Sequence, residues 1–218
     1  MTIPLQATAS TGKTRIRVFI DFWNFQLTLN GREAKARGEA DTRFPIDWRA
    51  LPNVITENAA RVLGVTDYAY EGSIIYASYN LGAVDGPKQH RWLTTWLDRQ
   101  PGLQVVCLER QPKKPPTCPS CHQAIVNCPH CNARIKATIE KGVDTALVTD
   151  MIRLAWEDAH DVGVVVSSDR DLVPAVTFLD AKGRKTIQAG FPPIGVDLAT
   201  SCWASFDLFP LRDQFRRN

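Results

Sequence analysis

The amino-acid sequence predicts an α/β fold in which a mainly parallel sheet is covered by helices on both faces. Short apolar runs rich in β-branched residues recur along the chain, as expected for strands that are buried on both sides. Segments with helical periodicity separate these runs, and this alternation is typical of parallel sheets whose strands are joined by helices. In such a sheet a ligand site lies beyond the carboxyl ends of the strands.

Five segments are predicted to be strands because each is short and rich in apolar, β-branched or aromatic residues. The first becomes fully apolar toward its end, and the fourth is apolar almost throughout. The five segments are 15–20, 73–79, 103–108, 162–167 and 185–189.

Four helices are predicted between or beside these strands. In the first, Asp47 is expected to cap the helix, and Pro52 is tolerated only in the first turn. In the third, an apolar stripe runs along one side from Val143 to Leu154, and in the fourth Gly183 supplies the expected stop. The four ranges are 47–59, 86–99, 143–158 and 172–181. The segment 30–44 is compatible with a loop or a weak helix.

Length and composition place the chain among ordinary globular proteins. It has 218 residues, 44% of them hydrophobic and 22% charged, which suits one domain with a small insertion. We expect a lead-in at 1–14 without fixed structure, a domain at 15–210 with an insertion at 112–136, and a tail at 211–218. The net charge of +3 is too small to indicate nucleic-acid binding by itself. No segment is apolar enough to span a bilayer or to serve as a signal peptide, so we expect a cytoplasmic protein without a membrane partner.

Acidic residues follow the two most apolar predicted strands. Asp21 comes directly after the first strand, with Asn24 three residues later. Asp169 and Asp171 follow the fourth strand, and Asp144 lies near the start of the helix that precedes it. If both strands are central, these side chains meet at one edge of the sheet. An aspartate after a strand is also a common turn residue or helix cap, so any one of them alone proves little.

Several carboxylates in one place repel each other unless a cation offsets their charge. An oxygen-rich site with open positions suits Mg²⁺ or Mn²⁺, and such a metal supports attack of water on a phosphodiester. Asp150 lies six residues after Asp144 and is rotated by about 120° around the helix, so it is left out of this set.

Three blocks of the sequence resemble the NYN domain family, which is related to PIN nucleases and includes LabA-like proteins. The first block is Val18-Phe-Ile-Asp-Phe-Trp-Asn24 and the second is Lys141-Gly-Val-Asp-Thr-Ala-Leu-Val-Thr-Asp150. The third is Val164-Val-Val-Ser-Ser-Asp-Arg-Asp171, followed by Pro174. The blocks occur in the family's order between residue 15 and about residue 191, and this order is more specific than any single block.

The resemblance implies a PIN-like three-layer fold and a metal-dependent ribonuclease that uses Mg²⁺ or Mn²⁺. It implies that Asp21, Asp144 and Asp169 are metal ligands, that Asp171 is a further ligand or supports one, and that Asn24 orients ligand or substrate. RNA is then the expected partner, and a homodimer remains open.

Four neighbouring residues are candidates for substrate binding. Lys141 is expected near a substrate phosphate, although a solvated loop lysine would have the same sequence. Ser168 is expected to hydrogen-bond a ligand, although serines after strands also close turns. Phe22 and Trp23 follow Asp21 and are expected either to stack on bases or to form a wall of the site. Phe22 and Ser168 stand where many relatives have Gly, so they add bulk beside the site.

Two Cys-x-x-Cys pairs predict a structural zinc site. Cys118, Cys121, Cys128 and Cys131 can supply four thiolates in a tetrahedron. Disulfides or free thiols are the alternatives, and the expected reducing compartment disfavours disulfides. Basic residues surround the pairs, so the insertion either grips a phosphate backbone or is simply folded by zinc.

The sequence thus favours a metal-dependent endoribonuclease. The alternative is an RNA-binding or adaptor module with weak catalysis that uses the zinc insertion. A haloacid dehalogenase type phosphatase is disfavoured because Trp23 stands where a second aspartate is needed, and a Toprim-like site lacks its glutamate. Trp92 and Trp96, four residues apart on a predicted helix, are expected to pack in the core rather than to stack on bases.

Overall fold

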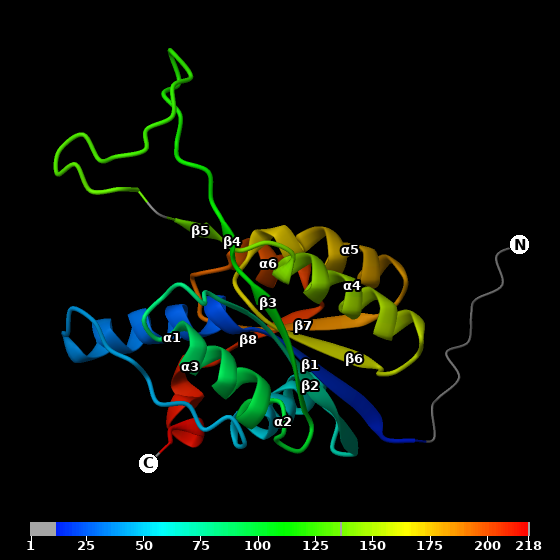
Figure 1. Ribbon diagram of the computed structural model, residues 1–218. Helices are drawn as coiled ribbons and strands as arrows, with labels where there is room; N and C mark the ends of the chain where they lie inside the picture. The colour runs from blue at the N-terminus through cyan, green and yellow to red at the C-terminus, as the bar shows by residue number, and fades with distance from the viewer. Residues whose placement is uncertain (1–11, 136, 218) are drawn as a thin grey trace, which may run out of the picture.

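The computed structural model describes residues 12–135 and 137–217, and its centre is a parallel sheet of six strands (Figure 1). The strand order is β3-β2-β1-β6-β7-β8, and every neighbouring pair is parallel. The strands are β1 (Thr14–Asp21), β2 (Tyr68–Tyr79), β3 (Leu103–Glu109), β6 (Val162–Val166), β7 (Lys185–Gly190) and β8 (Ala204–Asp207). The predicted α/β class with a parallel sheet is confirmed.

Helices cover both faces of the sheet, which gives three layers (Figure 1). On one face lie α1 (Phe22–Arg37), α2 (Leu51–Leu63), α3 (Gly86–Arg91) with the π-helix η1 (Trp92–Leu97), and the C-terminal 3-10 helix η3 (Phe209–Phe215). On the other lie α4 (Val143–Trp156), α5 (Val173–Ala181) and α6 (Val196–Ser201), with the 3-10 helix η2 (Arg170–Leu172) at the start of α5.

Strand β1 shows why these residues build a two-faced core. Successive side chains of a strand point to opposite faces. Ile16, Val18 and Ile20 are fully buried in the core beneath α1 and α2, whereas Phe19 is buried in the core beneath α4 and α5. The apolar run at the end of β1 therefore reflects burial on both sides.

The first helix differs from expectation. Residues 22–37 form α1, so the segment predicted as a loop or weak helix at 30–44 is helical in its first half. Polar residues interrupt its apolar face, and this hid the helical period from the sequence. Instead, the helix is fixed at its ends, by the Asp21 side chain at the start and by Gly38 in a left-handed conformation (φ 69°) at the end.

The C-terminal region also differs from expectation. The predicted tail at 211–218 is packed against the body over the part that the structure describes, because Phe215 is fully buried in the core. Glu33 on α1 is 3% exposed and forms ion pairs with Arg212 and Arg216. The strand β8 and helix α6 were not predicted, because their sequences are short and mixed in character.

An antiparallel hairpin leaves the body between β3 and α4. Its base is formed by β4 (Gln111–Pro112) paired with β5 (Thr138–Ile139). The segment between them, which contains both Cys-x-x-Cys motifs, extends away from the sheet (Figure 1). It corresponds to the predicted insertion at 112–136, of which residue 136 lies outside the described residues. The predicted lead-in at 1–14 lies outside them as far as residue 11, and Thr14 already belongs to β1.

A buried histidine at the opposite edge of the sheet makes stability depend on pH. His160 is 3% exposed, lies edge-on to Phe19 at 5.6 Å, and its Nδ1 has no hydrogen-bond partner among the residues described. Burial, together with the positive charges of Arg17 and Arg184, lowers the pKa of His160 from 6.5 to about 4.

We expect the free energy of unfolding to fall by about 3 kcal/mol as the pH drops from about 6.5 to about 4, because only the unfolded chain takes up this proton in that range. The stabilisation is complete above the pKa of the unfolded state and is lost as the pH approaches the folded value. Urea unfolding at several pH values measures it. A His160→Phe variant should show a flatter profile over this window, and an unchanged slope in that variant would contradict the assignment.

Candidate functional site

The acidic residues meet at the centre of the sheet. The chain builds β1, β2 and β3 toward one side and then returns to place β6 beside β1 before it continues outward with β7 and β8. The boundary between β1 and β6 is therefore the topological switch point, where α/β proteins place their ligands. Asp21 is the last residue of β1, and Asp169 follows the end of β6 by three residues.

A serine hydroxyl joins the two strand ends. Ser167 Oγ donates to Asp21 Oδ2 at 3.0 Å and accepts from the backbone N–H of Asp169 at 3.1 Å. Asp21 is 5% exposed, and its other carboxylate oxygen accepts from the backbone N–H of Asn24 at 3.3 Å. Asp21 thus caps α1 while it is held against the end of β6.

Asn24 forms a second connection across the same boundary. Its side-chain oxygen accepts from the backbone N–H of Ser168 at 2.8 Å. Asp169 in turn accepts from the backbone N–H of Asp171 at 2.9 Å and caps the short helix η2. The capping interpretation of Asp21 and Asp169 is therefore correct, and it coexists with their convergence.

Burial and neighbouring negative charges raise the pKa values of two aspartates at this edge. Burial raises the pKa of Asp21 to about 6, with further contributions from the charges of Asp144 and Glu140. Burial also raises the pKa of Asp144, and the negative charges of Asp169, Glu140 and Asp171 raise it further. The charges of Asp21 and Asp144 therefore interact, and those of Asp169 and Asp171 act on Asp144, although the four aspartates come from segments up to 150 residues apart.

Glu140 is a site residue that the sequence analysis missed. It precedes Lys141 directly, but it belongs to no predicted strand or helix. Its carboxylate accepts from the Ser78 hydroxyl and lies 3.4 Å from Arg110 Nη2. Arg110 Nε also donates to Ser78 Oγ at 2.9 Å. Arg110 precedes β4 and Glu140 follows β5, so both lie at the base of the cysteine hairpin.

The other candidates differ in their surroundings. Phe22 is 4% exposed and stacks on Trp48 at 5.4 Å, which favours the second of its two predicted roles, a wall of the site, over stacking on a base. Trp23 is half-buried, and its indole N–H donates to the carbonyl of Ser78 at 2.8 Å. Lys141 is exposed and forms no salt bridge to any residue that the structure describes. Ser168 contributes its backbone N–H to Asn24, as described above.

Asp150 is engaged elsewhere. It accepts from the Tyr76 hydroxyl at 3.0 Å and pairs with Arg153 at 3.0 Å. These contacts agree with the exclusion of Asp150 from the predicted metal ligands.

The acidic side chains do not surround a single metal position. Within residues 12–135 and 137–217, no three His, Cys, Asp or Glu side chains are close enough together to hold a metal ion directly. The donors at the switch point are nevertheless all oxygens that repel one another. This donor chemistry fits a hard cation that retains water ligands, such as Mg²⁺ or Mn²⁺.

The cysteine pairs form two turns of the same shape. In each, the backbone N–H of the residue after the second cysteine donates to the carbonyl of the first cysteine at 2.9 Å, from His122 to Cys118 and from Asn132 to Cys128. These two donors have positive φ angles, 57° and 55°. Backbone N–H groups of Cys121 and Ser120 lower the pKa of the Cys118 thiol, and the corresponding groups of Cys131 and His130 lower that of Cys128.

The four thiols are free and the two turns remain apart. As with the acidic edge, the described part of the hairpin contains no group of three potential ligands that would hold a metal. The structure therefore holds two Cys-x-x-Cys turns of the same shape and does not bring the four cysteines together in the tetrahedron that the sequence predicts.

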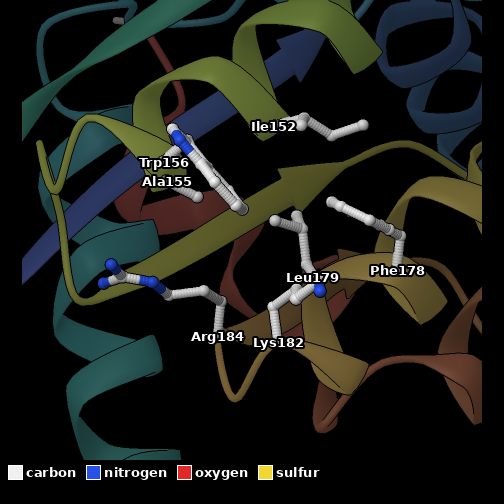
Figure 2. A pocket seen from close by; sticks show the side chains of 7 residues that line it. All are labelled: Ile152, Ala155, Trp156, Phe178, Leu179, Lys182 and Arg184. Carbon is white, nitrogen blue, oxygen red and sulfur yellow. The ribbon is translucent and has the colours of Figure 1, made fainter.

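A separate hollow of about 260 Å³ lies between α4 and α5 (Figure 2). Its lining is mostly apolar and includes Trp156, which is 73% exposed, and Phe178. Trp156 ends α4, whereas Asp144 lies in its first turn, so the hollow is remote from the acidic edge by about the length of that helix. Of the helices described, none is both long and apolar enough to cross a membrane.

Comparison with known families decides the relationship. The NYN domain family matches residues 15–204, which is most of the chain. The chain belongs to the NYN domain family. This confirms the resemblance predicted from the three sequence blocks, and it places the chain among PIN-like domains that are generally nucleases.

One solved structure resembles this NYN domain throughout. It is the crystal structure of a protein of unknown function from Vibrio parahaemolyticus, with a TM-score of 0.56 and 16% sequence identity. The match covers 96% of this chain and 100% of that one. At this identity the likeness concerns the fold alone. Among curated proteins, none matches the chain.

Burial of the Asp21 carboxylate should cost stability in the absence of metal. Its pKa is raised to about 6, so the protonated form stabilises the fold at low pH and this contribution is lost as the pH rises through that value. Without divalent cations at pH 8, Asp21→Asn should therefore raise the free energy of unfolding by about 1–3 kcal/mol. Below pH 4 the variant and the parent should have the same free energy of unfolding.

Urea unfolding of the two proteins measures this difference, and Asp41→Asn, at an exposed position, is the matched control. A variant that is less stable than the parent at pH 8 would show that the hydrogen bonds of Asp21 outweigh its burial.

Proposed function

We propose that this NYN domain is a metal-dependent endoribonuclease that hydrolyses RNA phosphodiester bonds at the switch-point edge of the sheet. The observation that carries the proposal is that the Ser167 hydroxyl holds the Asp21 carboxylate beside the backbone of Asp169, while the charges of Asp169 and Asp171 act on Asp144. A site that only bound RNA would gain nothing from several carboxylates that repel the phosphate backbone.

In this proposal Asp21, Asp144, Asp169 and Asp171 would hold Mg²⁺ or Mn²⁺, in part through water molecules that the ion retains. The bound metal would lower the pKa of a water molecule and offset charge that develops on the phosphate oxygens. Asn24 positions the loop after β6 through its hydrogen bond to Ser168, and Ser167 fixes the Asp21 carboxylate. Lys141, exposed beside Glu140 and Asp144, is available to a substrate phosphate.

Cleavage of labelled single-stranded RNA in Mn²⁺ or Mg²⁺ tests the proposal. We expect cleavage with either metal, loss of cleavage in EDTA, and recovery when the metal is added back. Asp169→Asn should lower the rate by at least about a hundredfold, because it removes a negative ligand from the metal.

Asp180→Asn, which changes an exposed aspartate of α5, should leave the rate unchanged. Cleavage that survives Asp169→Asn would overturn the assignment. If RNA binding persists without any metal-dependent cleavage, the domain is instead the RNA-binding module that the sequence left as the alternative.

We also propose that Cys118, Cys121, Cys128 and Cys131 bind one structural Zn²⁺ ion. Support comes from the two equivalent Cys-x-x-Cys turns, which each aim backbone N–H groups at the first cysteine. Closing the two halves around a metal would fold the hairpin, and metal binding commonly supplies the folding free energy of such small units.

Metal analysis of the purified protein should find about one zinc per chain, with tetrahedral sulfur coordination. Cys121→Ser and Cys131→Ser should each lose most of the zinc. Cys202→Ser should keep it, because that cysteine lies beside the core near α6, remote in sequence from the hairpin. Full zinc content in the Cys121→Ser, Cys131→Ser double variant would rule out this site.

A further inference from the structure

A large groove lies next to the start of α1, on the face of the sheet that α1 and α3 cover. Its volume is about 830 Å³. It is lined by α1, by the loop at 41–48, by α3 with the π-helix η1, and by Arg217 near the chain end. Phe22 and Trp23, two predicted substrate-binding residues, line the groove, whereas Trp92 and Trp96 were expected to pack in the core.

Aromatic rings dominate one wall of the groove. Trp92 and Trp96 stack on each other at 5.7 Å with an interplanar angle of 18°. The core positions of this helix are filled instead by Leu93 and Leu97, which are fully buried, whereas Trp96 is 38% exposed. The expectation that both tryptophans pack in the core is therefore wrong for Trp96. The segment that carries them is a π-helix, a rare form that is often retained at functional sites.

The polar groups of the groove suit a nucleotide strand better than a purely apolar ligand. Cations outnumber carboxylates, with Arg43, Lys88 and Arg217 against Asp41 and Asp85. The Arg49 guanidinium also lies 5.8 Å from the Trp96 ring. Aromatic faces combined with neighbouring cations are the usual means of holding single-stranded nucleic acid, because every base offers a ring face and every linkage a negative charge.

Trp23 lies between the groove and the acidic edge. This residue lines the groove and directly precedes Asn24, whose side chain contacts Ser168. Its indole N–H binds the carbonyl of Ser78, and the hydroxyl of the same serine contacts Glu140. Trp23 therefore connects the groove, through Ser78, with Glu140 at the acidic edge.

We propose that this groove binds unpaired nucleobases of an RNA strand beside the bond that is cut, with Trp96 as the exposed stacking surface. This inference rests on the proposed ribonuclease function, since it names the form of RNA that the same site accepts. A duplex would not fit the role, because its bases are stacked on one another and their faces are not available to protein rings. The domain therefore selects single-stranded RNA.

Binding of a short fluorescently labelled oligoadenylate tests the proposal, measured by anisotropy with the full chain carrying Asp169→Asn so that the RNA stays intact. Trp96→Ala should weaken binding by about tenfold, and Trp96→Phe should recover most of it, because a ring remains. Trp156→Ala, at the remote hollow between α4 and α5, is the matched control and should bind as the parent does.

An oligonucleotide of the same length without bases distinguishes stacking from charge. It keeps the phosphates, so the parent should bind it about as weakly as Trp96→Ala binds the intact strand, and Trp96→Ala should cause no further loss. Circular dichroism checks that the variant is folded. If Trp96→Ala weakens both oligonucleotides equally, or weakens neither, the groove does not bind bases. Equal binding of parent to duplex and single-stranded RNA would also overturn the proposal.

The two proposals fail separately. Base-dependent binding through Trp96 in a protein that never cleaves RNA would support the groove and refute the nuclease. Metal-dependent cleavage with full activity and binding in Trp96→Ala would support the nuclease and refute the groove.

Discussion

The ends of strands β1 and β6 are joined by hydrogen bonds that cross the centre of the sheet, and the geometry of the acidic edge depends on them. Ser167 binds the buried carboxylate of Asp21, and Asn24 binds the backbone after β6. Because these strands are adjacent and parallel, residues that are about 146 positions apart in sequence reach the same edge. The remaining carboxylates are added by loops and by the start of α4.

This arrangement lowers the stability of the folded protein at the acidic edge. A carboxylate that is 5% exposed and surrounded by other acids is unfavourable in the folded protein unless something offsets its charge. The surrounding structure tolerates it because the apolar cores on both faces of the sheet are extensive. An edge that is costly when empty of cations is also one that gains most when a cation binds.

The cysteine hairpin and the aromatic groove both contact Ser78 near that edge. The cysteine hairpin is anchored by Arg110 and Glu140, which share contacts with Ser78. The aromatic groove reaches the same serine through Trp23, and the Arg110 guanidinium lies 5.5 Å from the Trp23 ring. Metal binding in the hairpin and strand binding in the groove would therefore both act on groups next to the carboxylates.

The sequence by itself determined the fold class, five of the six strands of the main sheet and the four aspartates of the edge. These features are encoded locally, because apolar periodicity marks strands and a parallel sheet brings their carboxyl ends to one side. Helix α1, strand β8, Glu140 and the groove around Trp96 were decided only by the tertiary structure. Their roles depend on contacts between segments that are distant in the chain. Such contacts decide which side chains are exposed and which partners they bind, and they leave no periodic pattern in the sequence.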